Sequence, residues 1–148
     1  MKRLFIIFLL LICAFAFLSF SPAPTHTYFG GNIFFINASS CGLYWEFDII
    51  DKSKGGFKND RLCIEKNDTV MRQHLYSVLI AEAGKFNRSS ADPNNYFNKI
   101  TIYDMETGAL LIELLPEDMI FILKSGSIEK NDAVYEVFAD DSFLSGGQ

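Results

Sequence analysis

Apolar and polar residues alternate along several short stretches of the chain, which is the pattern of β-strands with one buried face. The clearest stretch is residues 43–49, in which every second residue is apolar. Residues 32–37 form a short apolar run between turn-forming residues, typical of a strand that is covered on both faces. Both stretches are therefore predicted to be strands.

The same alternation predicts further strands after residue 60. They comprise residues 61–66, 100–102, 110–114, 119–123 and 134–138. Two of them flank residues 104–108, where Gly108 supplies the backbone conformation that a tight turn needs. A hairpin is predicted there, whereas residues 87–98 are predicted to be a polar loop.

Residues 69–83 fit two patterns. Their apolar spacing fits a helical stripe, while the aromatic and β-branched content of residues 76–80 favours a strand. Asp68 is placed to cap a helix and Gly84 to end one. We favour a strand and keep a helix as the alternative.

About seven or eight short strands with turn-forming residues between them predict a small, single-domain all-β fold. We expect a β-sandwich of immunoglobulin-like character. The resemblance is one of architecture, because Trp45 follows Cys41 by only four residues and does not lie midway between two distant cysteines. A closed β-barrel is one alternative, and an α+β fold would follow if residues 69–83 were a helix.

The N-terminus has the order of an export signal. Lys2 and Arg3 precede fifteen apolar residues, Leu4 to Leu18, and small, turn-prone residues follow. As a helix this run would reach roughly 22 Å, short of the ~30 Å hydrocarbon core of a bilayer. We expect residues 1–23 to be a signal peptide, with an uncertain cleavage site, and residues 24–148 to be one β-rich extracytoplasmic domain. A retained leader or a lipid on Cys13 is the alternative, and it would be the chain's attachment to a membrane.

The domain that remains is acidic. Without Lys2 and Arg3 the 13 basic residues fall to 11 against 18 acidic ones, a net charge of −7. This charge disfavours binding to the phosphate backbone of nucleic acids. We expect a secreted, periplasmic or cell-surface protein, and the short basic segment of the leader is typical of bacteria.

Two cysteines remain once the leader is removed, Cys41 and Cys63. An even number in an oxidising compartment predicts a disulfide, which would contribute about 3 kcal/mol by restricting the unfolded chain. Two separate thiols are the alternative. Asn37, Asn67 and Asn87 each begin an N-x-S/T motif, which matters only in a eukaryotic source.

The sequence holds no motif for catalysis or for a cofactor. It lacks a Gly-x-Ser-x-Gly turn and a glycine-rich phosphate loop. Asp104-x-Glu106-x-Gly108 resembles the start of a calcium loop with its glycine one position early, and a hairpin turn explains it. We expect no enzyme, cofactor or metal, with a hydrolase of unknown type as a distant alternative that would use His74.

Aromatic residues are abundant, with 15 Phe, 6 Tyr and 1 Trp. They are expected to fill a core, or alternatively to line a barrel that carries a small apolar ligand. Gly42-Leu43-Tyr44-Trp45 is one residue longer than the Gly-x-Trp of lipocalins, to which it is similar. Our leading hypothesis is a non-enzymatic binding module of the cell envelope or extracellular space. Its partner is an unknown protein or envelope component, and Trp45, Tyr44 and His74 are possible contacts.

Overall fold

The computed structural model describes residues 25–50, 61–118 and 120–146. The strands are β1 (His26–Asn37), β2 (Leu43–Ile49), β3 (Arg61–Ile64), β4 (Thr69–Leu79), β5 (Phe97–Asp104), β6 (Leu110–Leu114), β7 (Ile122–Ser125) and β8 (Ala133–Ala139). Short helices are η2 (Ile80–Glu82), η3 (Arg88–Ala91), η4 (Pro93–Asn95), η5 (Pro116–Asp118), η6 (Ile128–Lys130) and α2 (Asp141–Leu144).

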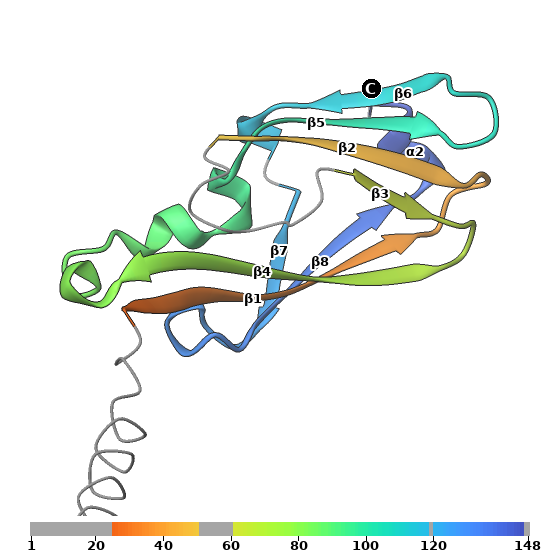
Figure 1. Cartoon of the computed structure of the whole chain (residues 1–148). Helices are drawn as coiled ribbons and strands as arrows, with labels where there is room; N and C mark the ends of the chain where they lie inside the picture. Colours follow the sequence, from red (N-terminus) through yellow and green to blue (C-terminus); the bar gives the residue numbers. More distant parts are fainter. Residues whose placement is uncertain (1–24, 51–60, 119, 147–148) are drawn as a thin grey trace, which may run out of the picture.

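The strands form two four-stranded sheets that stack face to face, as Figure 1 shows. Sheet A, the lower one in the figure, has the order β4-β1-β8-β7, and sheet B has the order β3-β2-β5-β6. The predicted all-β sandwich is confirmed, and the closed barrel is wrong for the described residues. Constant immunoglobulin domains have four strands (ABED) in one sheet and three (CFG) in the other, whereas both sheets described here have four strands. The likeness is therefore one of architecture alone.

Strand β1 is the centre of sheet A. It pairs antiparallel with β4 over eleven residues, from His26 opposite Leu79 to Ile36 opposite Thr69. On its other edge it pairs parallel with β8, which returns from the far end of the chain. Sheet B contains only antiparallel pairs. The first and last strands of the sequence are thus neighbours in the fold.

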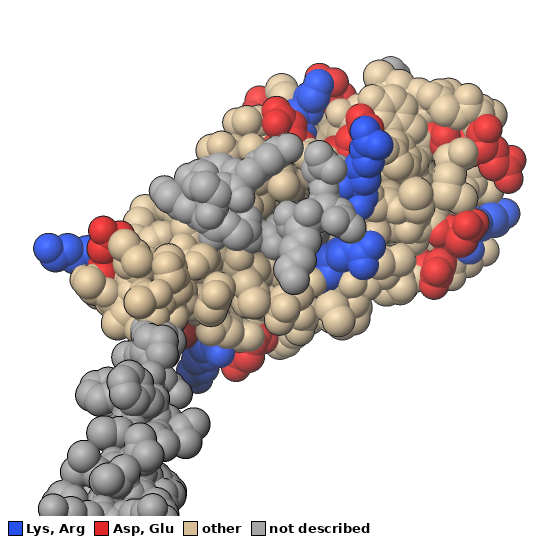
Figure 2. All heavy atoms as spheres, viewed as in Figure 1, with Lys and Arg blue, Asp and Glu red and all other residues tan. Residues whose placement is uncertain are grey.

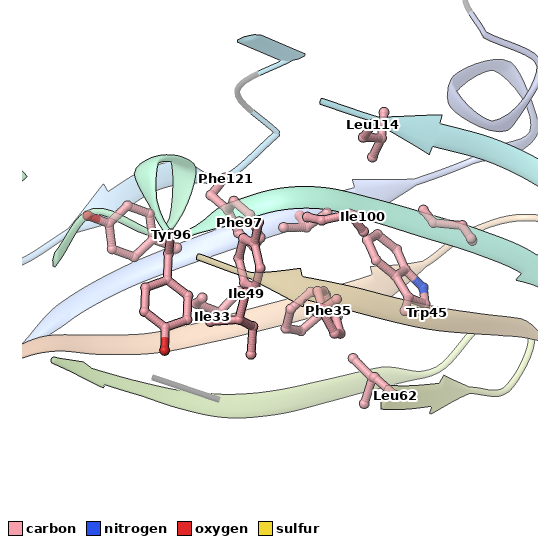
Figure 3. Packing of buried hydrophobic residues seen from close by; sticks show 14 of the residues in the cluster. Ile33, Phe35, Trp45, Ile49, Leu62, Tyr96, Phe97, Ile100, Leu114 and Phe121 are labelled. Carbon is pink, nitrogen blue, oxygen red and sulfur yellow. The ribbon is translucent and has the colours of Figure 1, made fainter. Parts of the chain in front are cut away.

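The core lies between the two sheets and is strongly aromatic (Figure 3). The Phe35 ring lies at its centre and makes edge-to-face contacts with Trp45 at 5.4 Å and with Phe121 at 6.1 Å. Such contacts add to the free energy gained by burial of the rings. The aromatic residues therefore do fill a core, as one interpretation of the composition expected.

Residues 69–79 form strand β4, so the strand interpretation of this ambiguous segment is confirmed there. The backbone pairs with β1 along the whole length of β4, and this long-range pairing outweighs the helical spacing of the apolar residues. The predicted hairpin is also present. Its turn is held by the Asp104 carboxylate, which accepts hydrogen bonds from the backbone of Glu106 and Thr107, and Gly108 has φ 70°.

The segment that was expected to be a polar loop and the segment that follows β8 both contribute to the core. The region 87–98 forms η3 and η4 and buries Ala91, Tyr96 and Phe97. Beyond β8, the Asp140 carboxylate caps α2 by accepting a hydrogen bond from the Phe143 backbone, and Leu144 is buried. The polar side chains of Asn87, Asp92 and Asp140 cap the first turns of η3, η4 and α2, and apolar residues within or after these helices reach the core.

The expected signal peptide, residues 1–23, and Cys13 lie outside the described residues. Within the described part of the chain, no helix combines the length and apolar character required to cross a bilayer.

Candidate functional site

The three residues predicted as possible contacts lie in different places. Trp45 is only 1% exposed, with its side chain between the sheets, and His74 is fully buried on the inner face of sheet A. Tyr44 is half-buried on the outer face of sheet B, where its hydroxyl donates a hydrogen bond to Glu46. The fold therefore does not assemble these residues into one site, and only Tyr44 reaches the surface.

His74 connects sheet A to the loop over it. Its Nε2 atom lies 3.0 Å from the carbonyl oxygen of Ala91, which can only accept, so the ring proton is on Nε2. The ring also meets the edge of Tyr96 at 4.9 Å. Burial lowers the pKa of His74 to about 4, against smaller opposing effects of Ala91 and Asp92. The ring is therefore neutral at physiological pH.

The predicted Cys41–Cys63 disulfide is wrong, because both cysteines are free and not within bonding distance. Cys63 lies opposite Tyr44 in the β2–β3 pair, and its side chain is exposed on the outer face of sheet B. Cys41 precedes β2. If the β2–β3 pairing continued beyond Leu43, Cys41 would lie opposite residue 66, three residues away from Cys63. Three residues of a strand span roughly 10 Å, beyond the ~7 Å limit between the Cα atoms of a disulfide.

A small pocket opens beside the edge of sheet B, between β5 and the segment that follows β6. Its lining includes Phe97, Ile100, Leu114, Ile120 and Phe121. The volume is about 20 Å³, enough for one water molecule, whereas a small-molecule site encloses roughly 300–1,000 Å³. This pocket gives no support to a carrier of apolar ligands.

The two outer faces of the sandwich differ in chemistry. On sheet B, charged residues of neighbouring strands pair across the face, with Lys99 3.1 Å from Glu113 and Arg61 3.7 Å from Glu46. Asp48 lies opposite Lys99 on the same face. Such a face is well solvated, as expected for the outside of a sandwich.

The outer face of sheet A is largely apolar. Phe34 at its centre lies opposite Met71 on β4 and Glu136 on β8, and Ile36 lies opposite Phe138. Because opposite residues share a face, these side chains form one surface. We call it the apolar face, and it comprises Phe34, Ile36, Met71, Leu75, Ile122, Val134 and Phe138.

Three members of the apolar face are about half exposed: Met71 at 50%, Ile122 at 55% and Phe138 at 53%. Together with the partly covered members, the surface presents roughly 400–500 Å² of apolar area, within the range of about 300–600 Å² for the largest apolar patch of a monomeric protein, and such patches are often functional. In Figure 2, charged side chains of both signs are spread over the upper sheet and the right-hand end.

Beside the residues of the apolar face, the outer face of sheet A carries one ion pair among the described residues. Lys124 of β7 lies 3.2 Å from Glu136 of β8, and their charges cancel. The remaining polar positions on this face are uncharged amides and hydroxyls, among them Asn32, Gln73 and Thr69. An apolar surface with a polar, uncharged rim is typical of a protein–protein interface.

One sequence signal pointed to this surface. The apolar run of residues 32–37 predicted a strand covered on both faces, and the structure covers only one of them. Ile33 and Phe35 are fully buried in the core, whereas Phe34 and Ile36 lie on the outside. The rest of the surface comes from strands distant in sequence and could not be assembled from the alternation alone.

Comparison with known proteins identifies no relatives: no family model, curated protein or solved structure matches this chain.

Proposed function

We propose that the protein is an exported, non-enzymatic binding module of the cell envelope or extracellular space, and that it binds a protein partner through the apolar face. The observation that carries the proposal is the contrast between the two outer faces. Sheet B presents paired charges to solvent, whereas sheet A presents Phe34, Met71 and Phe138. A contiguous apolar patch of this size is often a functional surface, and a partner that covered it would remove its apolar area from water.

The export step of this proposal rests on the leader, with its basic start and fifteen apolar residues. Free cysteines in the described part of the chain neither require nor oppose an oxidising compartment. The proposal therefore has two parts, the location and the binding surface, and each can be tested by itself. The mass and N-terminal residue of the natural protein test the first part.

Site-specific photo-crosslinking tests the binding surface. A benzophenone amino acid at position 138 would replace an exposed Phe138 side chain, and the matched control at position 110 would replace Leu110, which is exposed on the edge of sheet B. In the native host we expect irradiation to yield a discrete protein adduct from position 138 and none from position 110. Absence of an adduct from position 138, or equal adducts from both positions, would overturn the proposed surface.

A further inference from the structure

The apolar face has a chemistry that fits its own copy. The single ion pair beside it among the described residues places a positive charge, Lys124, next to a negative one, Glu136. In a two-fold symmetric interface, a contact from one residue to a second residue of the other subunit is matched by the reverse contact, so a neighbouring pair of opposite charges can be its own complement. We infer that the apolar face joins two copies of this chain, sheet against sheet, into a two-fold symmetric dimer.

The uncharged polar residues of the face are also self-complementary. Asn32 lies opposite Gln73, and Thr69 lies opposite Ile36 at the rim. Amides and hydroxyls both donate and accept hydrogen bonds, so each can pair with the same group of a second copy. A partner with a strong charge would find no unpaired opposite charge on this face among the described residues.

The area of the face is compatible with a dimer. A stable interface buries about 800 Å² on each partner. The apolar face supplies roughly half of that area, and its polar rim along β4 and β1 supplies neighbouring surface. Two sheets that stack in this way lie ~10 Å apart, and the side chains of their facing strands interdigitate. Phe34, on a central strand, would lie near the middle of the interface.

The dimer rests on the function proposed above, because it makes a second copy of the chain the partner that covers the apolar face. Sedimentation of the purified natural protein at concentrations up to about 100 μM should reveal a reversible monomer–dimer equilibrium. Phe138→Lys should weaken the dimer at least about a hundredfold, while Leu110→Lys, at a similarly exposed site on sheet B, should leave it unchanged. Circular dichroism and Trp45 fluorescence confirm that both variants are folded.

A charge-exchange experiment tests the two-fold geometry. Lys124→Glu and Glu136→Lys each place like charges across the interface, so each variant alone should dimerise about tenfold more weakly. An equimolar mixture should restore the dimer, because the carboxylate introduced at position 124 of one copy then meets the ammonium group introduced at position 136 of the other. Since mixing cannot repair the ion pair within a subunit, restoration would support contact between subunits.

Three results would overturn the dimer: a natural protein that is monomeric throughout the range, a dimer that withstands Phe138→Lys, or a mixture that is no stronger than the single variants. A monomer whose position 138 still crosslinks to a different protein would leave the proposed function standing. A monomer without any adduct from position 138 would remove both.

Discussion

The carbonyl oxygen of Ala133 on β8 occupies the space where a Cβ atom of residue 31 would lie, so Gly31 on β1 admits no side chain. Gly31 is also the first residue of β1 that pairs with β8. Close approach of two backbones is a recognised reason for glycine inside a strand. This contact lies where the first and last strands of the fold begin to join.

Gly31→Ala is expected to lower the free energy of unfolding by about 2–3 kcal/mol, because the new methyl group must push β8 away from β1. Urea unfolding followed by Trp45 fluorescence measures the change. Gly84→Ala is the matched control, since nothing lies within 4 Å of a Cβ atom at that position. It should be neutral or slightly stabilising, and a loss equal to that of Gly31→Ala would contradict the steric account.

Acid should destabilise the protein through His74. The folded-state pKa is about 4, below the ordinary value of 6.5, so the unfolded chain binds a proton first as the pH falls. The free energy of unfolding that depends on a neutral His74 ring is fully present above pH 6.5. It decreases progressively toward pH 4, by about 3 kcal/mol in total. Urea titrations between these pH values measure the loss.

The matched variants for that titration are His74→Asn and His26→Gln. Asparagine keeps a donor for the Ala91 carbonyl but does not titrate, so His74→Asn should be less stable at pH 7 and show a weaker dependence between pH 6.5 and 4. His26 is exposed at the start of β1, and His26→Gln should keep the full dependence. An unchanged slope in His74→Asn would show that other groups cause the acid sensitivity.

Both described thiols should react with an alkylating reagent in the folded protein, at different rates. Cys63 is exposed on sheet B, whereas Cys41 is half-buried and burial raises the pKa of its thiol, with Asp104 also favouring the protonated form. Because the thiolate is the reactive species, Cys63 should be modified first. Mass spectrometry of protein purified in reductant gives the order, and equal rates, or an unreactive pair, would contradict the structure.

Trp45 should report on the core. The indole is 1% exposed and packs against Phe35 and Phe47, so its emission should be blue-shifted and resistant to iodide until the protein unfolds. Trp45→Ala should cost about 3–5 kcal/mol because it leaves a cavity between the sheets. A native emission spectrum like that of free tryptophan would be inconsistent with this packing.

The sequence by itself determined the fold class and indicated where most of the strands lie, although β1 begins at His26, before the predicted run 32–37, and β7 is Ile122–Ser125 where residues 119–123 were predicted. The alternation from Leu43 to Ile49 and the hairpin around Gly108 are local patterns, because the side chains of a strand point to opposite faces at every step. A two-residue period therefore identifies a strand without knowledge of its neighbours. It also predicted that the apolar run around Phe34 is a strand covered on both faces, of which the described structure covers one.

Only the tertiary structure decided which strands are neighbours and what each face meets. The register of β2 with β3 separates Cys41 from Cys63, and the pairing of β1 with both β4 and β8 brings Phe34, Met71 and Phe138 onto one surface. These relationships join residues far apart in the chain, where a shift of one residue would reverse every side chain. No local period carries that information, so the apolar face emerges only from the packed sheets.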